Sequence, residues 1–481
     1  MNKIVRAKTL ALFIILAVFV TSLASCKDDI ATSSNVSSSN VATMDTTTEH
    51  VEGSGTATSD MDTQPTDSTA SPINTTPVSA STTAPVKIDM NKLRGTTVRL
   101  LWWHPLTQDE ENIIKDFTRK TGIKVTTTET TTDDYQSKLA SMVIAKDSPD
   151  VAIIPTSTSQ GAFPVGVLAT MQPISVTGQN LNDSFWDKRI MDAYKINGKY
   201  YCFSSPNSWF SNATVVFYNV DLFEENGITT PRDLWKSGKW DWTTLKNAAA
   251  EIMKIGTGYY GLASPDSMAF LSSAGVDYVS YNGKTFKNTI TDSNVLKACT
   301  FNAELVNEGL EYPATGTSPA VEYLKGKIGM YATNTWSMRK DADFGNAKFE
   351  IDAVPFPSPK GSKQYIGSRS NLFAIPKNAN NPQGAGVFLR YLLDKNNYPR
   401  TFDAVSINPK MKDTFDFVTA SSANRAVLYS TGVVGYSNAS DYGRMNFLLL
   451  QVAPNQVNTL LQSNKSMFDT AVINANKALN K

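Results

Sequence analysis

Histidine and cysteine are scarce in this sequence of 481 residues. The two histidines, His50 and His104, and the three cysteines, Cys26, Cys202 and Cys299, are far apart along the chain. Metal sites built from several histidines or four thiolates are therefore excluded, as is a scaffold framed by disulfides. Because His50 lies in a stretch without aromatic residues, a Ser-His-Asp triad in the folded part would have to use His104 as its base.

An excess of one charge is also missing, because 45 Lys and Arg residues offset 44 Asp and Glu residues. This balance disfavours a nucleic-acid binder, which needs a cationic surface. The local charge nevertheless changes along the chain: residues 1–26 carry +3, residues 27–86 carry −7 and the remainder carries +5. Three compositions indicate three parts with different physical roles.

The first 25 residues are typical of a secretory signal peptide. Three basic residues precede an apolar run over residues 10–20, and Leu-Ala-Ser precedes Cys26. The run is shorter than the roughly 20 residues that span a bilayer. The end of this segment resembles the lipobox of bacterial lipoproteins, which implies that Cys26 is lipidated and becomes the mature N-terminus. A plain signal peptide and an uncleaved anchor are the alternatives.

Residues 26–86 are predicted to be the lipidated cysteine followed by a disordered tether. Residues 27–86 contain 25 Ser or Thr residues, four prolines and no Phe, Trp or Tyr. Such a segment cannot bury enough apolar area to offset its chain entropy. Its negative charge should extend it, so that it holds a domain away from the membrane. A glycosylated or partner-binding segment is the alternative.

From residue 96 onward, strand and helix patterns alternate. Residues 97–103, 123–128 and 151–154 have strand character, and helices are predicted over 107–121 and 135–143. The first helix begins with a capping box from Thr107 to Glu110 and ends at Gly122. Further strands are predicted at 215–219, 259–263 and 327–332, and further helices at 242–255, 295–308 and 381–393. The alternation indicates an α/β fold with a mostly parallel first layer, and the length of this part indicates two lobes.

Two common enzyme signatures are not supported by the sequence around them. Residues 256–261 match the letters of a GxGxxG nucleotide loop, but a helix precedes them and a strand follows, which is the reverse of the dinucleotide-binding arrangement. Carboxylates occur in pairs, yet no spacing marks two that would face each other across a glycosidase cleft. We therefore expect no catalytic residues, cofactor or metal.

The tryptophans are the most informative residues, and all eight lie in the globular part. Trp102 and Trp103 end the first predicted strand, where ligands bind in open α/β sheets. Because side chains alternate along a strand, the two rings are expected on opposite faces, with at least one facing a crevice. Trp209 and Trp336 lie in loop-like stretches, the latter after a strand ending at Ala332. Aromatic rings stack on sugars, although core packing is the commoner role of a single tryptophan.

Six segments carry a family pattern in a fixed order. They are 98–125 (ending DFTRKTGIKV), 135–154 (YQSKLASMVIAKDSPDVAII), 217–228 (FYNVDLFEENGI), 231–245 (PRDLWKSGKWDWTTL), 325–339 (KGKIGMYATNTWSMR) and 380–394 (NNPQGAGVFLRYLLD). Together, behind a lipobox, they resemble the extracellular solute-binding proteins of family 1, the sugar-binding receptors of ABC importers. The resemblance covers residues 96–481.

The resemblance implies an α/β, two-lobed periplasmic-binding-protein-like fold with a ligand cleft between lobes joined by hinge crossovers. By position, lobe 1 would comprise residues 96–207 and 371–418, and lobe 2 residues 215–366 and 425–481. The hinges would fall near 208–214, 367–370 and 419–424.

The resemblance also implies where ligand is bound. The loop after the first strand contributes Trp102, Trp103 and His104, although His104 is as readily a plain surface histidine. The remaining implied ligand-binding residues are Thr156, Ser157, Trp209, Trp336, Ser368 and Arg369. Of these, Trp336 occupies the position at which many members stack an indole on sugar.

The expected protein is a lipid-anchored receptor on the extracytoplasmic face of the cell membrane. Its expected partners are a carbohydrate, ABC permease subunits and, through Cys26, the membrane; we expect a monomer that binds no nucleic acid. A receptor for a polyamine, peptide or anion on the same fold, or a secreted carbohydrate-active enzyme, is the alternative. Cys202 and Cys299 have apolar neighbours in sequence, which favours two separate buried thiols over a disulfide.

Overall fold

The computed structural model describes residues 88–480 except 133, 155–164, 207–212, 264–267, 314–317, 339–343, 345–346, 368–371, 398–407, 421–444 and 446–447. The predicted signal peptide, Cys26 and tether lie outside the described residues. The chain divides into two units, residues 1–80 and 81–481, and all described elements belong to the second unit. None of the described helices combines the length and apolar content that crossing a membrane requires.

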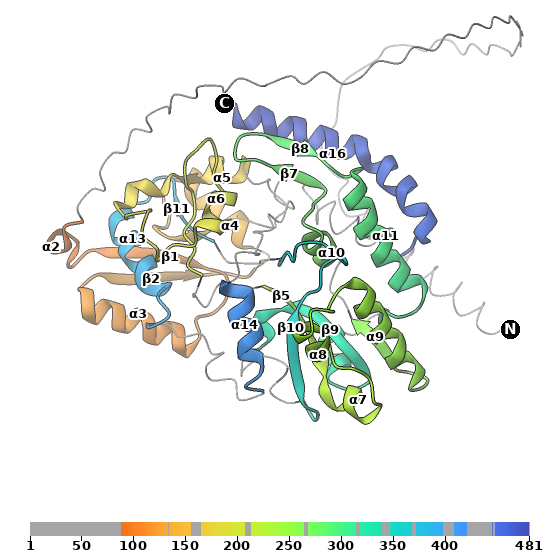
Figure 1. The fold of residues 1–481 in the computed structure, drawn as a ribbon. Helices are drawn as coiled ribbons and strands as arrows, with labels where there is room; N and C mark the ends of the chain where they lie inside the picture. The colour runs from red at the N-terminus through yellow and green to blue at the C-terminus, as the bar shows by residue number, and fades with distance from the viewer. Residues whose placement is uncertain are drawn as a thin grey trace, which may run out of the picture. The chain divides into compact units, whose positions relative to one another are not determined.

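The predicted strands and helices are present in this unit in the predicted order, together with further elements that were not predicted (Figure 1). The strands are β1 (Thr97–Trp102), β2 (Lys124–Glu129), β3 (Ala152–Ile153), β4 (Met171–Gln172), β5 (Thr214–Asn219), β6 (Tyr260–Ala263), β7 (Val279–Tyr281), β8 (Phe286–Asn288), β9 (Ile328–Asn334), β10 (Ile351–Pro355) and β11 (Phe373–Pro376). The longer helices are α3 (Gln108–Thr121), α4 (Tyr135–Ile144), α9 (Trp242–Lys254), α11 (Ser293–Asn307), α13 (Pro382–Leu392), α14 (Met411–Ala420) and α16 (Val457–Leu479). The shorter helices are α2 (Met90–Leu93), α5 (Val165–Thr170), α6 (Lys188–Ala193), α7 (Val220–Glu225), α8 (Pro231–Lys236), α10 (Met268–Ser273) and α12 (Pro319–Tyr323), with 3-10 turns η1 (Ile174–Thr177), η2 (Thr335–Met338) and η6 (Pro454–Gln456).

The first sheet is formed by two ladders, β2-β1 and β3-β11-β4, which a parallel bridge between Leu100 and Val151 links. β1 pairs with β2 in parallel, and Leu101 N donates to Val151 O at 3.0 Å just before β3. The parallel arrangement of the first three strands is therefore confirmed. β11 then lies between β3 and β4 and is antiparallel to both, a pairing that local sequence patterns do not predict.

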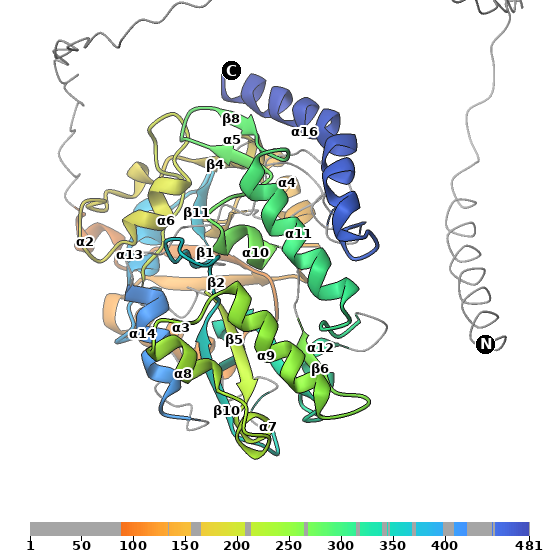
Figure 2. The same ribbon diagram turned by 45° about the vertical axis from the view of Figure 1, so that its right-hand side comes forward.

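The second sheet has the order β10-β5-β9-β6. β5 is antiparallel to both of its neighbours, and β6 is parallel to β9. Every residue of β5 is buried because both faces are covered: Val216 and Tyr218 belong to the larger core and Val215 and Phe217 to a second cluster. Helices α7, α8 and α9 gather beside this sheet in Figure 2.

Local capping rules explain where the first long helix begins and ends. The Thr107 side chain accepts from Glu110 N while the Glu110 carboxylate accepts from Thr107 N, so the predicted capping box is confirmed. At the other end, Gly122 adopts a left-handed φ of 75° and its N–H bonds Thr118 O. The same logic holds for α13, which opens with Asn381 as N-cap and Pro382 in the first turn.

Helix α14 packs against the second sheet. Thr414 Oγ1 donates to Ala353 O in β10 at 2.6 Å, and Arg232 Nη2 bonds Lys410 O at 2.9 Å. Met411 and Val418 belong to the hydrophobic cluster that includes Val215 of β5. The resemblance implies that residues 411–418 belong to lobe 1, whereas the contacts of α14 are with β10 and with the hydrophobic cluster of the second sheet.

The C-terminal helix α16 runs along the β7–β8 hairpin and α11 (Figures 1 and 2). The Asn476 side chain accepts a hydrogen bond from Phe286 N at 2.8 Å and donates one to Phe286 O at 2.9 Å, which attaches β8 to α16. Asn197 Nδ2 also donates to Leu479 O, which ties the end of α16 to the turn after α6. Cys202 and Cys299 are buried and free, which confirms the prediction of two separate thiols.

Candidate functional site at the strand ends

The carboxyl edge of the first sheet gathers several of the predicted segments. β1 ends at Trp102 and β3 at Ile153, whereas antiparallel β11 begins beside them at Phe373. Ile154 N donates to Leu372 O at 2.7 Å, so the chain leaves β3 and enters β11 at one place. Thr156 and Ser157 follow β3, and Ser368 and Arg369 precede β11. These four residues lie outside the described residues, but the ends that carry them share the edge at which α/β sheets bind ligands.

The two tryptophans of β1 have unequal exposure. Trp102 is 1% exposed and stacks on Phe373, with ring centroids 6.0 Å apart and an interplanar angle of 20°. Trp103 is partly exposed and its ring centroid lies 4.1 Å from that of Trp102. The expectation that the rings lie on opposite faces is therefore wrong. β1 ends at Trp102, the chain bends at Trp103, and the strand alternation does not extend to the second ring.

His104 continues this aromatic cluster. Its ring meets that of Trp103 edge-on at 5.0 Å, and its Nδ1 lies 2.7 Å from Pro105 O. A carbonyl oxygen only accepts, so Nδ1 carries the proton of that bond. Nε2 faces the buried Glu110 carboxylate at 3.6 Å, and the His104 side chain is 34% exposed. The imidazole is thus held at the edge of the site with part of its surface open to solvent.

Tyr135 holds the ends of β1 and β3 in position. Its hydroxyl donates to Leu101 O at 3.3 Å and accepts from Ile153 N at 2.7 Å. Burial raises the pKa of this phenol well above its ordinary value, so it remains a donor at any physiological pH. Tyr135 therefore supports the site and lies beneath it.

Two carboxylates near this edge are occupied by backbone groups. Glu110 is 4% exposed and its carboxylate accepts from Thr107 N at 2.8 Å. The Glu129 carboxylate, at the end of β2, accepts from Leu106 N at 3.1 Å. Both carboxylates therefore order the loop between β1 and α3.

The second sheet presents a corresponding edge. Parallel β6 and β9 end at Ala263 and Asn334, and antiparallel β5 begins at Thr214, which pairs with Asn334. Thr335 closes this edge by donating its N–H to Ala213 O at 2.8 Å and accepting from Ala213 N at 3.1 Å. Trp336 follows within η2, two residues beyond the end of β9, so the strand is longer than the sequence pattern predicts. The Trp336 side chain lies outside the described part.

Two connections run between the sheets and are bonded at their ends. Phe203 and Phe373 exchange backbone hydrogen bonds of 2.7 and 3.3 Å near the first sheet. Thr214 N donates to Gly367 O at 2.8 Å near the second sheet. The two connections therefore have neighbouring ends at each sheet. The first connection, after Phe203, includes Trp209, and the second follows Gly367. Trp209 itself lies outside the described residues.

Besides the Glu110 carboxylate, which accepts from Thr107 N, nine polar side chains buried near these strand ends are uncharged. They are Ser204, Ser205, Thr214, Ser272, Ser273, Thr333, Asn334, Thr335 and Ser337. Sequence reasoning identified none of them as site residues, because they come from four separate segments and only the fold brings them together. One local signal was available: Asn334 and Thr335 immediately precede Trp336.

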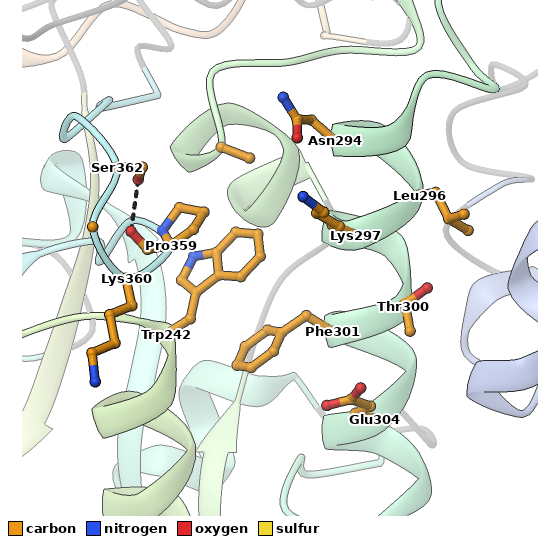
Figure 3. A pocket seen from close by; sticks show the side chains of 12 residues that line it. Trp242, Asn294, Leu296, Lys297, Thr300, Phe301, Glu304, Pro359, Lys360 and Ser362 are labelled. Carbon is orange, nitrogen blue, oxygen red and sulfur yellow. Dashed lines mark hydrogen bonds between the residues drawn. The ribbon is translucent and has the colours of Figure 1, made fainter.

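A separate pocket of about 690 Å³ lies between α9, α11 and the loop at 359–362 (Figure 3). Trp242 and Phe301 form its aromatic wall, with ring centroids 4.9 Å apart at 21°. Trp242 Nε1 donates to Ser273 Oγ and Pro357 O, both at 3.0 Å, so the indole is fixed. Trp102, Trp103 and His104 do not line this pocket. Within the described part, no three His, Cys, Asp or Glu side chains gather to hold a metal ion.

Comparison with known proteins identifies the family. Residues 112–425, more than half of the chain, match the bacterial extracellular solute-binding proteins. The chain therefore belongs to this family. Binding proteins of Brucella abortus and Brucella suis are 26% identical over 199 residues, which is 38% of this chain and 45% of each relative. The match thus spans less than half the length of these curated relatives.

Solved structures show the same fold at low sequence identity. An ABC substrate-binding protein of Listeria monocytogenes in complex with cycloalternan has a TM-score of 0.59 at 18% identity, over 77% of this chain and 99% of its own. UgpB of Mycobacterium tuberculosis in complex with glycerophosphocholine has a TM-score of 0.60 at 17% identity, over 78% and 98%. A solute-binding protein of Staphylococcus aureus in complex with maltose has a TM-score of 0.57 at 15% identity, over 77% and 97%. The α/β fold is thus the two-lobed fold of solute-binding proteins.

Proposed function

We propose that this chain is a lipid-anchored, extracytoplasmic receptor that captures a sugar or oligosaccharide and delivers it to an ABC importer. The proposal rests mainly on the Trp103 ring, which is partly exposed where β1 ends, at the edge from which ligands of α/β sheets are bound. An indole stacks on the apolar face of a sugar ring, and neighbouring hydroxyl and amide groups bond its hydroxyls.

The charge of the described site supports a neutral solute. Apart from Glu110, whose carboxylate accepts a backbone N–H, the buried polar side chains named at the strand ends are hydroxyls and one amide, whereas an ion would require a buried counter-charge. The structural relatives from Listeria monocytogenes and Staphylococcus aureus are in complex with cycloalternan and maltose, which are saccharides. We therefore place the sugar at these strand ends, with Trp102 supporting Trp103 from beneath.

The second candidate is a receptor for a non-sugar solute on the same fold. The relative from Mycobacterium tuberculosis is in complex with glycerophosphocholine, which carries charged groups. This alternative requires charged side chains at the site, and the predicted contact Arg369 is a candidate for an anion. The hydroxyl and amide groups among the described residues favour the sugar.

The third candidate, a carbohydrate-active enzyme, has less support. A glycosidase uses two carboxylates that face the scissile bond. Glu110 and Glu129 are the carboxylates beside the aromatic cluster, and each of them accepts a backbone N–H. We therefore assign capture without chemistry.

Capture is proposed to proceed by closure of the lobes around the solute, the hinge motion of binding proteins. The paired connections at Phe203–Phe373 and Thr214–Gly367 support hinges at the predicted positions 208–214 and 367–370. Cys26 would hold the receptor at the membrane through its lipid, close to the permease subunits.

The test is a thermal-shift screen of residues 87–481 against maltose, raffinose and cycloalternan, with putrescine, phosphate and amino acids as the charged set. A ligand that binds only the native state stabilises it by about 2.7 kcal/mol at a hundredfold excess over Kd. We expect one of the saccharides to raise Tm and to be recovered unchanged. A response confined to the charged set would transfer the assignment to the second candidate, and a cleaved saccharide would transfer it to the third.

A further inference from the structure

Asn334, at the end of β9, has a buried side-chain oxygen that the fold does not use. The residue is 7% exposed, and its Oδ1 is shielded from solvent and has no hydrogen-bond partner. Such an atom lowers stability, because its bonds to water are lost on folding and nothing replaces them. A residue of this kind therefore requires a reason for its presence.

Other orphaned oxygens in the described part have no connection with the strand ends. The Tyr323 hydroxyl lies at the end of α12, before β9 begins, among the rings of Tyr331, Phe344 and Phe349. The Ser148 hydroxyl lies before β3 begins. Asn334, in contrast, lies where β9 ends, two residues before Trp336.

Hydroxyl groups from two other elements lie near this end of β9. Thr214 of β5 is the register partner of Asn334. A Cβ atom added to Gly367 would lie 3.0 Å from Thr214 Oγ1 and 3.3 Å from Ser272 Oγ, so these groups crowd around one point of the second connection. The group thus combines an amide from β9 with hydroxyls from β5 and α10, and it contains no charge.

We propose that Asn334 is a solute-binding residue, whose side-chain amide bonds a hydroxyl of the neutral saccharide with Thr214 and Ser272 beside it. A saccharide hydroxyl both donates and accepts, so it satisfies either end of the amide. The proposal deepens the function proposed above and rests on it. It also implies that the empty receptor retains an unsatisfied group that only the solute satisfies.

The test exploits the opposite effects that this role predicts on stability and on binding. Asn334→Leu replaces the amide by an apolar group of similar size, and Tyr323→Phe removes the orphaned hydroxyl distant from the site as a matched control. Both variants of residues 87–481 are melted without ligand and then titrated calorimetrically with maltose, raffinose and cycloalternan. We expect both variants to melt at or above the wild-type temperature. We expect N334L to lose about tenfold or more in affinity for the saccharide that wild type binds, and Y323F to bind as wild type.

Each other outcome has a distinct meaning. If N334L binds the saccharide as tightly as wild type, Asn334 is satisfied by an internal water and the inference fails, while the receptor function stands. If N334L melts well below wild type, the amide has a structural role and the inference fails whatever the ligand. If wild type binds no saccharide, the proposed function and this inference fail together.

Discussion

Trp102 and Trp103 are adjacent in sequence yet have different physical roles. Trp102 is 1% exposed and stacks on Phe373, whereas Trp103 is partly exposed beside His104. A buried indole contributes through packing, and a partly exposed one is available to a ligand. Substitutions at the two positions should therefore affect different properties.

Trp102→Ala should destabilise the protein by about 3–5 kcal/mol, because it empties a packed position in the core. Trp103→Ala should cost far less stability and should weaken saccharide binding about tenfold through loss of stacking. Urea unfolding and calorimetric titration of both variants separate the two effects. Equal binding by W103A and wild type would remove Trp103 from the site.

The two buried thiols give a prediction about reactivity. Burial raises the pKa of the Cys299 thiol to about 12 and that of the Cys202 thiol further, so both remain protonated at pH 8. Only the thiolate is nucleophilic. We expect iodoacetamide to add nothing to native residues 87–481 at pH 8, and to add two groups after unfolding without a reductant. Mass spectrometry measures both states, and an unfolded chain that stays unmodified would instead indicate a disulfide.

Sequence reasoning at the residue scale succeeded where local rules apply. The Thr107 capping box is confirmed because its partners lie three residues apart, whereas the roles of Trp103 and His104 at the site stay predictions. Asn334, Thr214 and Ser272 were missed because their proximity depends on the pairing of β5 with β9 and on the course of a connection near Gly367. No window of sequence contains that information.

At the scale of elements, a buried ion pair attaches α8 to the second sheet. The Arg232 guanidinium on α8 pairs with the Asp352 carboxylate in β10, and Asp352 is 1% exposed. Arg232 also bonds Ala353 O and Lys410 O, and the Tyr218 hydroxyl donates to Asp352 at 2.9 Å. The network therefore joins α8, β5, β10 and the start of α14.

Arg232→Met should destabilise the protein by about 3–5 kcal/mol, because it leaves the buried Asp352 carboxylate without its counter-charge. The exposed pair Lys236–Asp413 joins α8 to α14 and serves as the control. Lys236→Met should change stability by less than about 1 kcal/mol. Urea denaturation followed by tryptophan fluorescence measures both variants, and similar costs for the two would show that the buried pair has no special role.

Five of the longer helices, α3, α4, α9, α11 and α13, agree with their sequence patterns, as do strands β1, β2, β3, β5, β6 and β9, whereas β4, β7, β8, β10 and β11 were not predicted. The 3.6-residue period of α9 and α11 and the apolar runs of β1 and β5 are local properties. β4 has only two residues and exists because β11 pairs with it. A strand that forms only because a partner pairs with it cannot be predicted from its own sequence.

At the scale of the whole molecule, the sheets are linked by connections that meet at Phe203–Phe373 and Thr214–Gly367. If the lobes close around a saccharide, the radius of gyration of residues 87–481 should fall when the saccharide binds. Small-angle X-ray scattering with and without the saccharide measures this change, and Asn334→Leu at the same saccharide concentration provides the control for weakened binding. An unchanged radius at saturation would contradict closure.

The position of β11 between β3 and β4 has a consequence for how the chain is made. β11 begins at Phe373, and both of its neighbours precede residue 173. A chain that emerges from its N-terminus therefore presents β3 and β4 long before their shared partner arrives, and non-local pairing of this kind slows folding. During that interval both strands have open edges that other chains can pair with. Truncations that end before Phe373 should consequently aggregate rather than form a smaller receptor.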